Sequence, residues 1–347
     1  MQILSIGVGI PSFKLTNEQI LFDLEKYNQD IPQKVVNKYQ REVAYLLQKA
    51  GSKTRYIRDK NKQETAISLV KSAMLDALRN VNMAKSDIDL LIFCGVGRGF
   101  LEPANAYFYA NALGMNCRCF DISDACMSWV RALEIAYLFL KSGSSKNIMI
   151  INAEFTAYEY GYPDLLKIET LKQIRYTFPT YTIGEAATAT IISRSQHEWS
   201  FYYESVPQLS KLCAIPLKGY EDFCEKDQGN NFHGAYRFVA YGSGLFETAV
   251  KHLVNIVQQK VININEPDIW FPHAASSNVC LEAGKILCID PQKLYVKTFI
   301  EYGNLISASI PVAINIAFRE NKLKRGDKVI LCPASAGMAF AVVQFSF

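Results

Sequence analysis

Short apolar segments alternate with longer segments of helical periodicity along the first half of the chain. Buried strands are predicted by apolar runs at 2–10, 90–97, 117–122 and 146–155. Helices are predicted where apolar residues recur every three or four positions, at 64–81, 106–114 and 126–143. Short apolar strands between helices indicate a sheet that helices cover on both faces, so the fold class is α/β.

The most apolar part of the chain is the stretch 329–345 near its C-terminus. Pro333 and Gly337 interrupt this stretch, which therefore predicts two buried strands. No charge-free stretch reaches the roughly 18 residues that a membrane span requires. The first residues lack the charged region of a signal peptide, and we expect a reduced, cytoplasmic protein.

One supersecondary unit occurs twice in the sequence. In both 131–154 and 311–335, an apolar helix runs into a Lys-containing end, a Gly, polar residues and a buried strand. A long-period repeat of this kind indicates two related halves rather than a solenoid. We place the halves at 1–195 and 196–347. Residues 205–235, rich in charges and aromatics, are interpreted as an insertion or lid.

The composition narrows the classes of function. Half of the 347 residues are hydrophobic and the net charge is +4, without a strong basic block. A sizeable core is expected and nucleic-acid binding has no support, although a modest basic surface suits an acidic carrier or a phosphate-bearing ligand. The nine cysteines include no C-x-x-C pair, so no metal site is predicted.

Cys126 stands at the start of the helix predicted over 126–143. The first turn of a helix carries a partial positive charge and unpaired N–H groups, which stabilise a thiolate and lower the pKa of the thiol. The same N–H groups can hold an oxyanion when the thiolate attacks a thioester. The alternative interpretation is that Cys126 is a small buried hydrophobe.

Two further residues are candidates for the same site. His273 follows a strand-like run and enters a loop, although a structural, hydrogen-bonded histidine would occur there too. Asn304 lies in a Gly-Asn turn before a helix, where Asn can also act as a cap. Ser307 in the second copy corresponds to Cys126 in the first. If the two repeated helix starts face each other, Cys, His and Asn meet and can run acyl transfer.

Three motifs together resemble the ketosynthase III family of the thiolase-like superfamily. They are FDISDACMSWVRAL at 120–133, PHAASSN at 272–278 and YGNLISASIPVAI at 302–314, and weaker similarity covers nearly the whole chain. The resemblance implies a five-layered α-β-α-β-α fold of two repeated halves and a homodimer. The fold of two halves agrees with the internal repeat.

The resemblance also implies a role for each candidate residue. Cys126 would take an acyl group from a thioester, and His273 and Asn304 would stabilise the enolate of a second thioester. Backbone N–H groups of Cys126 and of the turn containing Ser335 and Gly337 would form the oxyanion hole. The product is a 3-oxoacyl compound. Coenzyme A or acyl-carrier-protein thioesters are the implied substrates, with no tightly bound cofactor.

The sequence departs from the family pattern at several positions. Ser335 stands where a glycine is usual, and the family's G-D-G-A motif reads Gly184-Glu185-Ala186-Ala187. Family positions for substrate binding after the histidine are occupied by Ser276 and Asn278. The candidate substrate-binding residues are Tyr45, Lys49, Ser276 and Lys285.

Glu102, before Pro103, is a departure with a chemical consequence. Bacterial initiation enzymes of the family have an aromatic residue at this position, which reaches the neighbouring active site of the dimer. A glutamate resembles the branch that joins two acyl thioesters head to head. A plain acyl thioester must lose an α-proton, for which a carboxylate acting across the dimer is a candidate base. The alternative is an exposed residue of a turn.

The sequence leaves three classes of function open. The first is a condensing enzyme, with either a malonyl donor that loses carbon dioxide or a plain acyl donor. The second is an acyltransferase that passes the Cys126-bound group to an oxygen or nitrogen nucleophile. The third is a non-catalytic partner in a heterodimer, which the intact set of Cys126, His273 and Asn304 disfavours.

Overall fold

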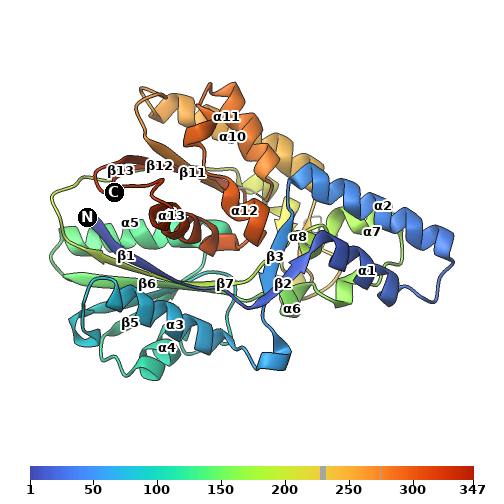
Figure 1. The fold of residues 1–347 in the computed structure, drawn as a ribbon, viewed down its shortest axis with the longest axis horizontal. Helices are drawn as coiled ribbons and strands as arrows, with labels where there is room; N and C mark the ends of the chain where they lie inside the picture. Colours follow the sequence, from blue (N-terminus) through green and yellow to red (C-terminus); the bar gives the residue numbers. More distant parts are fainter. Residues whose placement is uncertain (227–231, 274) are drawn as a thin grey trace.

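The computed structural model describes residues 1–226, 232–273 and 275–347. Two β-sheets lie one above the other, with helices between them and on both outer sides (Figure 1). This arrangement confirms the α/β class and the five-layered α-β-α-β-α fold that the resemblance implied. The helical layers form because each helix presents an apolar face that is buried by packing against a sheet or a neighbouring helix.

The first sheet has five strands in the order β1-β7-β6-β4-β5. They are β1 (Gln2–Gly9), β4 (Leu90–Cys94), β5 (Arg118–Ile122), β6 (Asn147–Glu154) and β7 (Ala186–Ser193). β4 pairs in parallel with β5 and β6, whereas β7 runs antiparallel to β1 and β6. β4 is buried along its whole length, as its uninterrupted apolar sequence predicts for a strand covered on both faces.

The second sheet has four strands in the order β11-β12-β13-β8. They are β8 (Ser200–Ser205), β11 (Ile269–His273), β12 (Lys328–Ser335) and β13 (Ala339–Ser346). The two strands predicted over 329–345 are β12 and β13. The predicted division of the chain at residue 195 falls between the last strand of the first sheet and the first strand of the second.

Six helices make the three helical layers (Figure 1). The outer pair on the first sheet is α3 (Ala66–Arg79) and α4 (Asn105–Leu113), and the outer pair on the second is α10 (Gly242–Lys260) and α11 (Ser277–Ile286). Between the sheets lie α5 (Ser128–Lys141) and α13 (Ser309–Arg319). The buried side chains of α5 and α13 share one core cluster with residues of both sheets.

The internal repeat is visible in the topology. α5 leads into β6 and α13 leads into β12, and each strand has a parallel neighbour on one side and an antiparallel neighbour on the other. A 3₁₀ turn precedes each central helix, η3 (Ala125–Met127) before α5 and η8 (Ile306–Ala308) before α13. The two turns contact each other at the centre of the molecule.

A further group of helices and two short strands packs at one end of the layers (Figure 1). They are α1 (Asn17–Tyr27), α2 (Gln33–Ala50), α6 (Ala157–Tyr160), α7 (Leu171–Tyr176), α8 (Pro179–Thr182), α12 (Lys297–Tyr302), β2 (Phe13–Thr16) and β3 (Thr54–Ile57). Their apolar side chains form a separate core cluster, to which Cys126 is added at its edge. This cluster therefore forms one side of the region where the two repeats meet.

The segment interpreted as an insertion or lid has little regular structure. It contains η5 (Pro207–Leu212), β9 (Cys213–Ala214) and η6 (Tyr220–Phe223), and β9 pairs with β10 (Val239–Ala240). Residues 227–231 of this segment lie outside the described residues. Among the residues that the structure does describe, no helix has the length and apolar character needed to cross a membrane.

Candidate active site

Cys126 lies in the turn η3, two residues before α5 begins, rather than inside the helix itself. The turn is held from several directions. The Met127 N–H donates to Asp124 O at 2.9 Å and to Ser335 Oγ at 3.2 Å, and Ser128 Oγ donates to Ala125 O at 2.7 Å. Ala125 has a φ of 45°, which is unusual for a residue with a side chain. The backbone is thus fixed around the thiol in a conformation that a regular helix would not give.

The environment of Cys126 sets its ionisation. Burial raises the pKa of the thiol well above its ordinary value, and the neighbouring Cys213 and Glu154 add to this effect. Hydrogen bonds from the backbone N–H groups of Ala336 and of Cys126 itself act in the opposite direction. The lowered pKa predicted from the helix start is therefore wrong for the free protein, because desolvation outweighs the effect of the turn.

The Ala336 and Cys126 amides are positioned to receive negative charge. Both lower the pKa of the sulfur because they donate toward it, and the oxyanion of an attacked carbonyl would form next to the sulfur. Ser335 contributes through its side chain, whose hydroxyl accepts from Met127 N–H and donates to Asp124 O at 3.3 Å. Gly337 has a φ of 109° in the same turn. The assignment of Cys126, Ser335 and Gly337 to an oxyanion hole stays a prediction.

His273 is the last residue of β11, where the parallel strand ends beside β12. Its side chain is 4% exposed, and burial lowers the pKa of the imidazole to about 4. At neutral pH the ring is uncharged, with one N–H donor and one acceptor nitrogen. Nε2 has no hydrogen-bond partner among the described residues, so it is available to a ligand.

Asn304 follows α12 and is held by its backbone on both sides. Its N–H donates to Thr182 O at 2.8 Å, and its carbonyl accepts from Gly184 N–H at 3.0 Å. The side-chain Oδ1 accepts from Ile306 N–H at 2.9 Å. The amide is thereby oriented with Nδ2 as the remaining donor, to which the described part of the chain offers no acceptor. Asn304 is thus oriented to donate to a ligand in the cavity.

Cys126, His273 and Asn304 line the same cavity, of about 370 Å³. The turn from Ala334 to Met338 forms another part of its wall. The rest of the wall is mostly apolar and comes from Phe178, Phe238, Leu245, Phe246 and Ala249. Three polar side chains in an otherwise mostly apolar lining suit a molecule with a reactive carbonyl and a hydrocarbon chain.

The segment interpreted as a lid supplies part of this wall. Cys213, Ala214 and Ile215 line the cavity, so at least the strand β9 belongs to the site. Burial raises the pKa of Cys213 to about 12, which keeps this second thiol protonated. Sequence reasoning missed Cys213 and the apolar wall because neither has a local motif, and only the fold brings them to Cys126.

The second repeat presents a counterpart of the cysteine turn. Ile306 has a φ of 52°, close to that of Ala125, and Ser307 follows it. The Ser307 hydroxyl donates to the buried carboxylate of Glu154 and accepts from Asn152 Nδ2 at 2.8 Å. Ser307 is 2% exposed and does not line the cavity. Both turns border the cavity, through Ala125 and Cys126 in the first half and through Ile306 in the second, but only the first presents a thiol to it.

The remaining predicted site residues lie away from the cavity of their own chain. Glu102 is exposed on the loop between β4 and α4, beside the exposed Phe100 and Leu101. Tyr45 and Lys49 are exposed on α2. No group of three or more His, Cys, Asp or Glu residues suited to a metal ion occurs within 1–226, 232–273 and 275–347.

Ser276 and Lys285 belong to α11. Ser276 is fully buried, and its hydroxyl caps the helix by accepting from Val279 N–H while donating to Ala50 O at 3.1 Å. Contact between Ser276 and a substrate would require this cap to break. Lys285 is exposed in the last turn of the helix. Of these two residues, only Lys285 is accessible to a partner.

Two family models match parts of the chain. Residues 120–205 match the family model described as 3-oxoacyl-[acyl-carrier-protein (ACP)] synthase III. Residues 257–347 match the model of the C-terminal part of that family. The beta-ketoacyl-[acyl-carrier-protein] synthase III of Aliarcobacter butzleri is 30% identical over 87% of this chain and 89% of its own. The enzyme of that name from Campylobacter fetus is 28% identical over 99% and 98%.

Solved structures show the same fold. The 3-oxoacyl-[acyl-carrier-protein] synthase III from Aquifex aeolicus superposes with a TM-score of 0.79 at 24% identity, covering 100% of this chain and 99% of the other. Xanthomonas campestris OleA, solved with bound lauric acid and lauroyl-CoA, superposes with a TM-score of 0.83 at 22% identity, covering 99% and 98%. At these identities the likeness establishes the arrangement of the elements.

Proposed function

Because this chain belongs to the 3-oxoacyl-[acyl-carrier-protein] synthase III family of condensing acyltransferases, we propose that Cys126 is its acyl-accepting nucleophile. The observation that carries the proposal is that Cys126, His273 and Asn304, from distant parts of the sequence, line one cavity. One nucleophile and two hydrogen-bond donors facing a common space are what a two-step condensation requires.

In the first step, the Cys126 sulfur attacks the carbonyl carbon of an acyl thioester. Because burial raises the pKa of Cys126, the sulfur loses its proton only as it attacks, and the neutral His273 in the same cavity can accept that proton. The Ala336 and Cys126 amides stabilise the tetrahedral oxyanion. The thiol of the carrier then leaves with a proton, and the acyl group remains on Cys126.

In the second step, a second thioester becomes an enolate at its α-carbon. A malonyl donor forms it by losing carbon dioxide, and a plain acyl donor forms it by losing a proton. His273 and Asn304 donate to the enolate oxygen, a role for which a neutral imidazole and an oriented amide are suited. The enolate carbon attacks the acyl-cysteine carbonyl. The new carbon–carbon bond expels Cys126, which regains a proton, and a 3-oxoacyl thioester is released.

The proposed base for a plain acyl donor is Glu102 of a partner subunit in a homodimer. Two features support this assignment: the loop of Glu102 is exposed next to Phe100 and Leu101, and β5 is an edge strand of the first sheet. An exposed apolar loop beside a free sheet edge is suited to an interface. The dimer would bring Glu102 to a cavity that its own chain does not offer it.

Delivery of the thioester is assigned to the exposed ends of α2 and α11. Tyr45 and Lys49 offer an aromatic ring and a cation one turn apart for a coenzyme A nucleotide, and Lys285 offers a cation for an acidic carrier protein. Asn278 Nδ2 donates to Lys49 O at 2.9 Å, so the start of α11 lies against the end of α2 that carries Tyr45 and Lys49.

Mass spectrometry after incubation with acyl-CoAs of increasing length tests the proposal. The intact protein should gain the mass of one acyl group on Cys126, and the adduct should disappear when malonyl-CoA or a second acyl-CoA is added, with a 3-oxoacyl product. Transfer of the acyl group to an alcohol or amine without a 3-oxoacyl product would instead identify the acyltransferase alternative. Absence of any adduct across the series would refute the nucleophile assignment.

A further inference from the structure

Three segments that are distant in the sequence meet directly behind Asn304. They are the strand β3 with Arg58 after it, residues 182–185 before β7, and residues 300–304 at the end of α12. β3 is bonded to the end of α12 by Lys53 N–H, which donates to Ile300 O at 2.9 Å. Tyr56 of β3 stacks on Tyr302, with ring centroids 5.3 Å apart.

The carboxylate of Glu185 holds this junction together. Glu185 is 0% exposed, and its Oε2 accepts from the backbone N–H of Arg58 at 2.8 Å and from Arg58 Nε at 3.0 Å. Its Oε1 accepts from Arg58 Nη2 at 3.0 Å and from Ala157 N–H at 3.3 Å. Its own N–H donates to Tyr56 O at 2.7 Å. The side chain and the backbone of Glu185 are therefore both attached to β3 and the residue after it.

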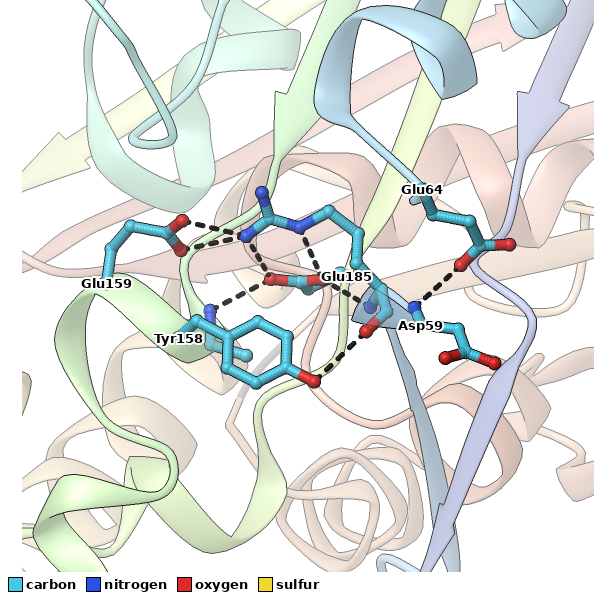
Figure 2. Close-up of polar contacts among 7 residues, drawn as sticks. Asp59, Glu64, Tyr158, Glu159 and Glu185 are labelled. Carbon is cyan, nitrogen blue, oxygen red and sulfur yellow. Dashed lines mark hydrogen bonds and ion pairs between the residues drawn. The ribbon is translucent and has the colours of Figure 1, made fainter. Parts of the chain in front are cut away.

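Arg58 also pairs with a second carboxylate, and Figure 2 shows dashed lines from both Glu159 and Glu185 to the same guanidinium group. Its Nη2 donates to both oxygens of Glu159 at 2.8 and 2.9 Å, and its guanidinium lies over the rings of Phe155 and Tyr158. Burial alone would lower the pKa of Arg58, but its hydrogen bonds to Glu185 and Glu159 raise that pKa above its ordinary value. The inner carboxylate is buried, whereas the outer one is half-exposed.

The junction is continuous with Asn304. Gly184, next to Glu185, donates its N–H to Asn304 O, and Thr182 O accepts from Asn304 N–H. The fit is close, because a Cβ added to Gly184 would lie 2.1 Å from Tyr302 O, and one added to Gly303 would lie 2.4 Å from Thr182 O. A shift of residues 182–185 would therefore move Asn304, because the two backbone segments are in close contact.

We propose that Arg58 and Glu185 are positioning residues that hold the backbone of Asn304 in place for the condensation step. The inference rests on the proposed function, in which Asn304 donates to the enolate and Cys126 accepts the acyl group. It also explains the departure of Glu185 from the family motif. The longer glutamate reaches Arg58 with both of its oxygens, and the ion pair ties β3 to the segment that carries Asn304.

The test separates the two half-reactions in the full-length protein. Glu185→Gln keeps the size of the side chain but sets an amide N–H₂ against the donors of Arg58. Acylation of Cys126 should stay within about twofold of the parent, whereas the condensation kcat should fall by about tenfold or more, because a small displacement of a donor strongly affects rate. Arg58→Lys, which keeps the charge but cannot span both carboxylates, should give an intermediate loss.

Two controls distinguish positioning from general destabilisation. Glu159→Gln removes only the outer partner of the same arginine and should leave both half-reactions near the parent rates. Leu24→Ala truncates a fully buried side chain in α1 and should lower stability without separating acylation from condensation. In Glu185→Gln, hydrogen exchange of the Gly184 and Asn304 amides should accelerate, because both donate across the junction.

Equal loss of acylation and condensation in Glu185→Gln, or unchanged condensation in that variant, would overturn the inference while leaving the proposed function standing. Failure of the parent protein to acylate Cys126 or to condense would overturn the proposed function itself. Hydrogen exchange in Glu185→Gln can be measured in that case too. Unchanged exchange rates of the Gly184 and Asn304 amides would overturn the positioning role independently of activity.

Discussion

Ser307 occupies in the second half of the molecule the position that Cys126 occupies in the first. Each follows a residue with positive φ, Ala125 at 45° and Ile306 at 52°, in a 3₁₀ turn that leads into a central helix. The turn of Cys126 is bonded to Ser335 at the end of β12, and Ser307 is bonded to Glu154 at the end of β6. In each half, therefore, the turn is bonded to a residue at the end of a strand in the opposite half.

Replacement of Cys126 by Ala should abolish the covalent acyl adduct. Without the sulfur there is no acyl acceptor, and condensation should fall by about a thousandfold or more, while the fold should be kept because the change removes a single atom at the edge of a core cluster. Intact-protein mass spectrometry and a condensation assay measure the two effects. An adduct of full occupancy on the Ala variant would place the nucleophile elsewhere.

Replacement of Ser307 by Ala should affect stability and not acylation. The buried Glu154 would lose the hydroxyl donor and Asn152 would lose an acceptor, at a cost of about 1–3 kcal/mol in the free energy of unfolding. Urea unfolding monitors the first effect, and the rate of adduct formation on Cys126 checks the second. A loss of acylation as large as that of Cys126→Ala would contradict the assignment of Ser307 to a structural role.

Protonation of His273 should make stability fall as the pH drops from about 6.5 to about 4. The folded protein keeps the ring neutral down to a pKa of about 4, whereas the unfolded chain binds the proton below its ordinary pKa, so acid favours unfolding in this window. The loss amounts to about 3 kcal/mol when complete. The total fall in unfolding free energy between about pH 6.5 and 4 should be smaller by about that amount in His273→Gln. An unchanged slope in the variant would assign the acid sensitivity to other groups.

Mixed dimers test the position of Glu102. A Cys126→Ala chain paired with a Glu102→Gln chain forms one site in which both residues are intact only if Glu102 acts on its partner's cavity. For a plain acyl donor, randomly mixed dimers should recover about a quarter of the parent activity, because half are mixed and each has one complete site. With a malonyl donor, Glu102→Gln alone should remain active. No recovery on mixing would place the carboxylate in the cavity of its own chain or outside the mechanism.

Removal of the Ser335 hydroxyl should loosen the turn that carries Cys126. Ser335→Gly abolishes the hydrogen bonds to Met127 N–H and Asp124 O, and acylation should slow by about tenfold, which corresponds to one hydrogen bond of about 1–1.5 kcal/mol. Pre-steady-state acylation kinetics give the rate. Acylation at the parent rate would mean that the remaining bonds of the turn suffice to hold the sulfur.

Much of the central architecture could be predicted from the sequence. The strands β4, β6, β12 and β13 are strongly apolar, α5 has helical periodicity, and the helix–strand unit repeats, so local pattern and topology agree. The sequence of α2 also has buried residues at three- and four-residue spacing, which is typical of an amphipathic helix. Of this helix, only Tyr45 and Lys49 entered the prediction from the sequence. Its burial against α1 and α11 depends on contacts that a local pattern does not encode.

The sequence predicted where the three candidate residues lie along the chain, but not the ionisation of Cys126. Cys126, His273 and Asn304 each follow or precede an element with a clear local pattern, so their placement at element ends was accessible. The ionisation of Cys126 was not, because it depends on burial in the folded chain and on the neighbouring Cys213 and Glu154, which are distant in the sequence. Desolvation depends on the whole fold, and it raises the pKa of Cys126, whereas the sequence predicted a lowered pKa.

The apolar wall of the cavity has a consequence for how this molecule can change. Phe178, Phe238, Phe246 and Ile215 come from stretches that contribute none of the three reacting side chains. Mutations in those stretches can lengthen, shorten or bend the chamber while the sulfur, the imidazole and the carboxamide keep their places. Under the proposed function, selectivity for a hydrocarbon tail and bond formation would therefore be set by separate parts of the polypeptide, and mutation could change the first without disturbing the second.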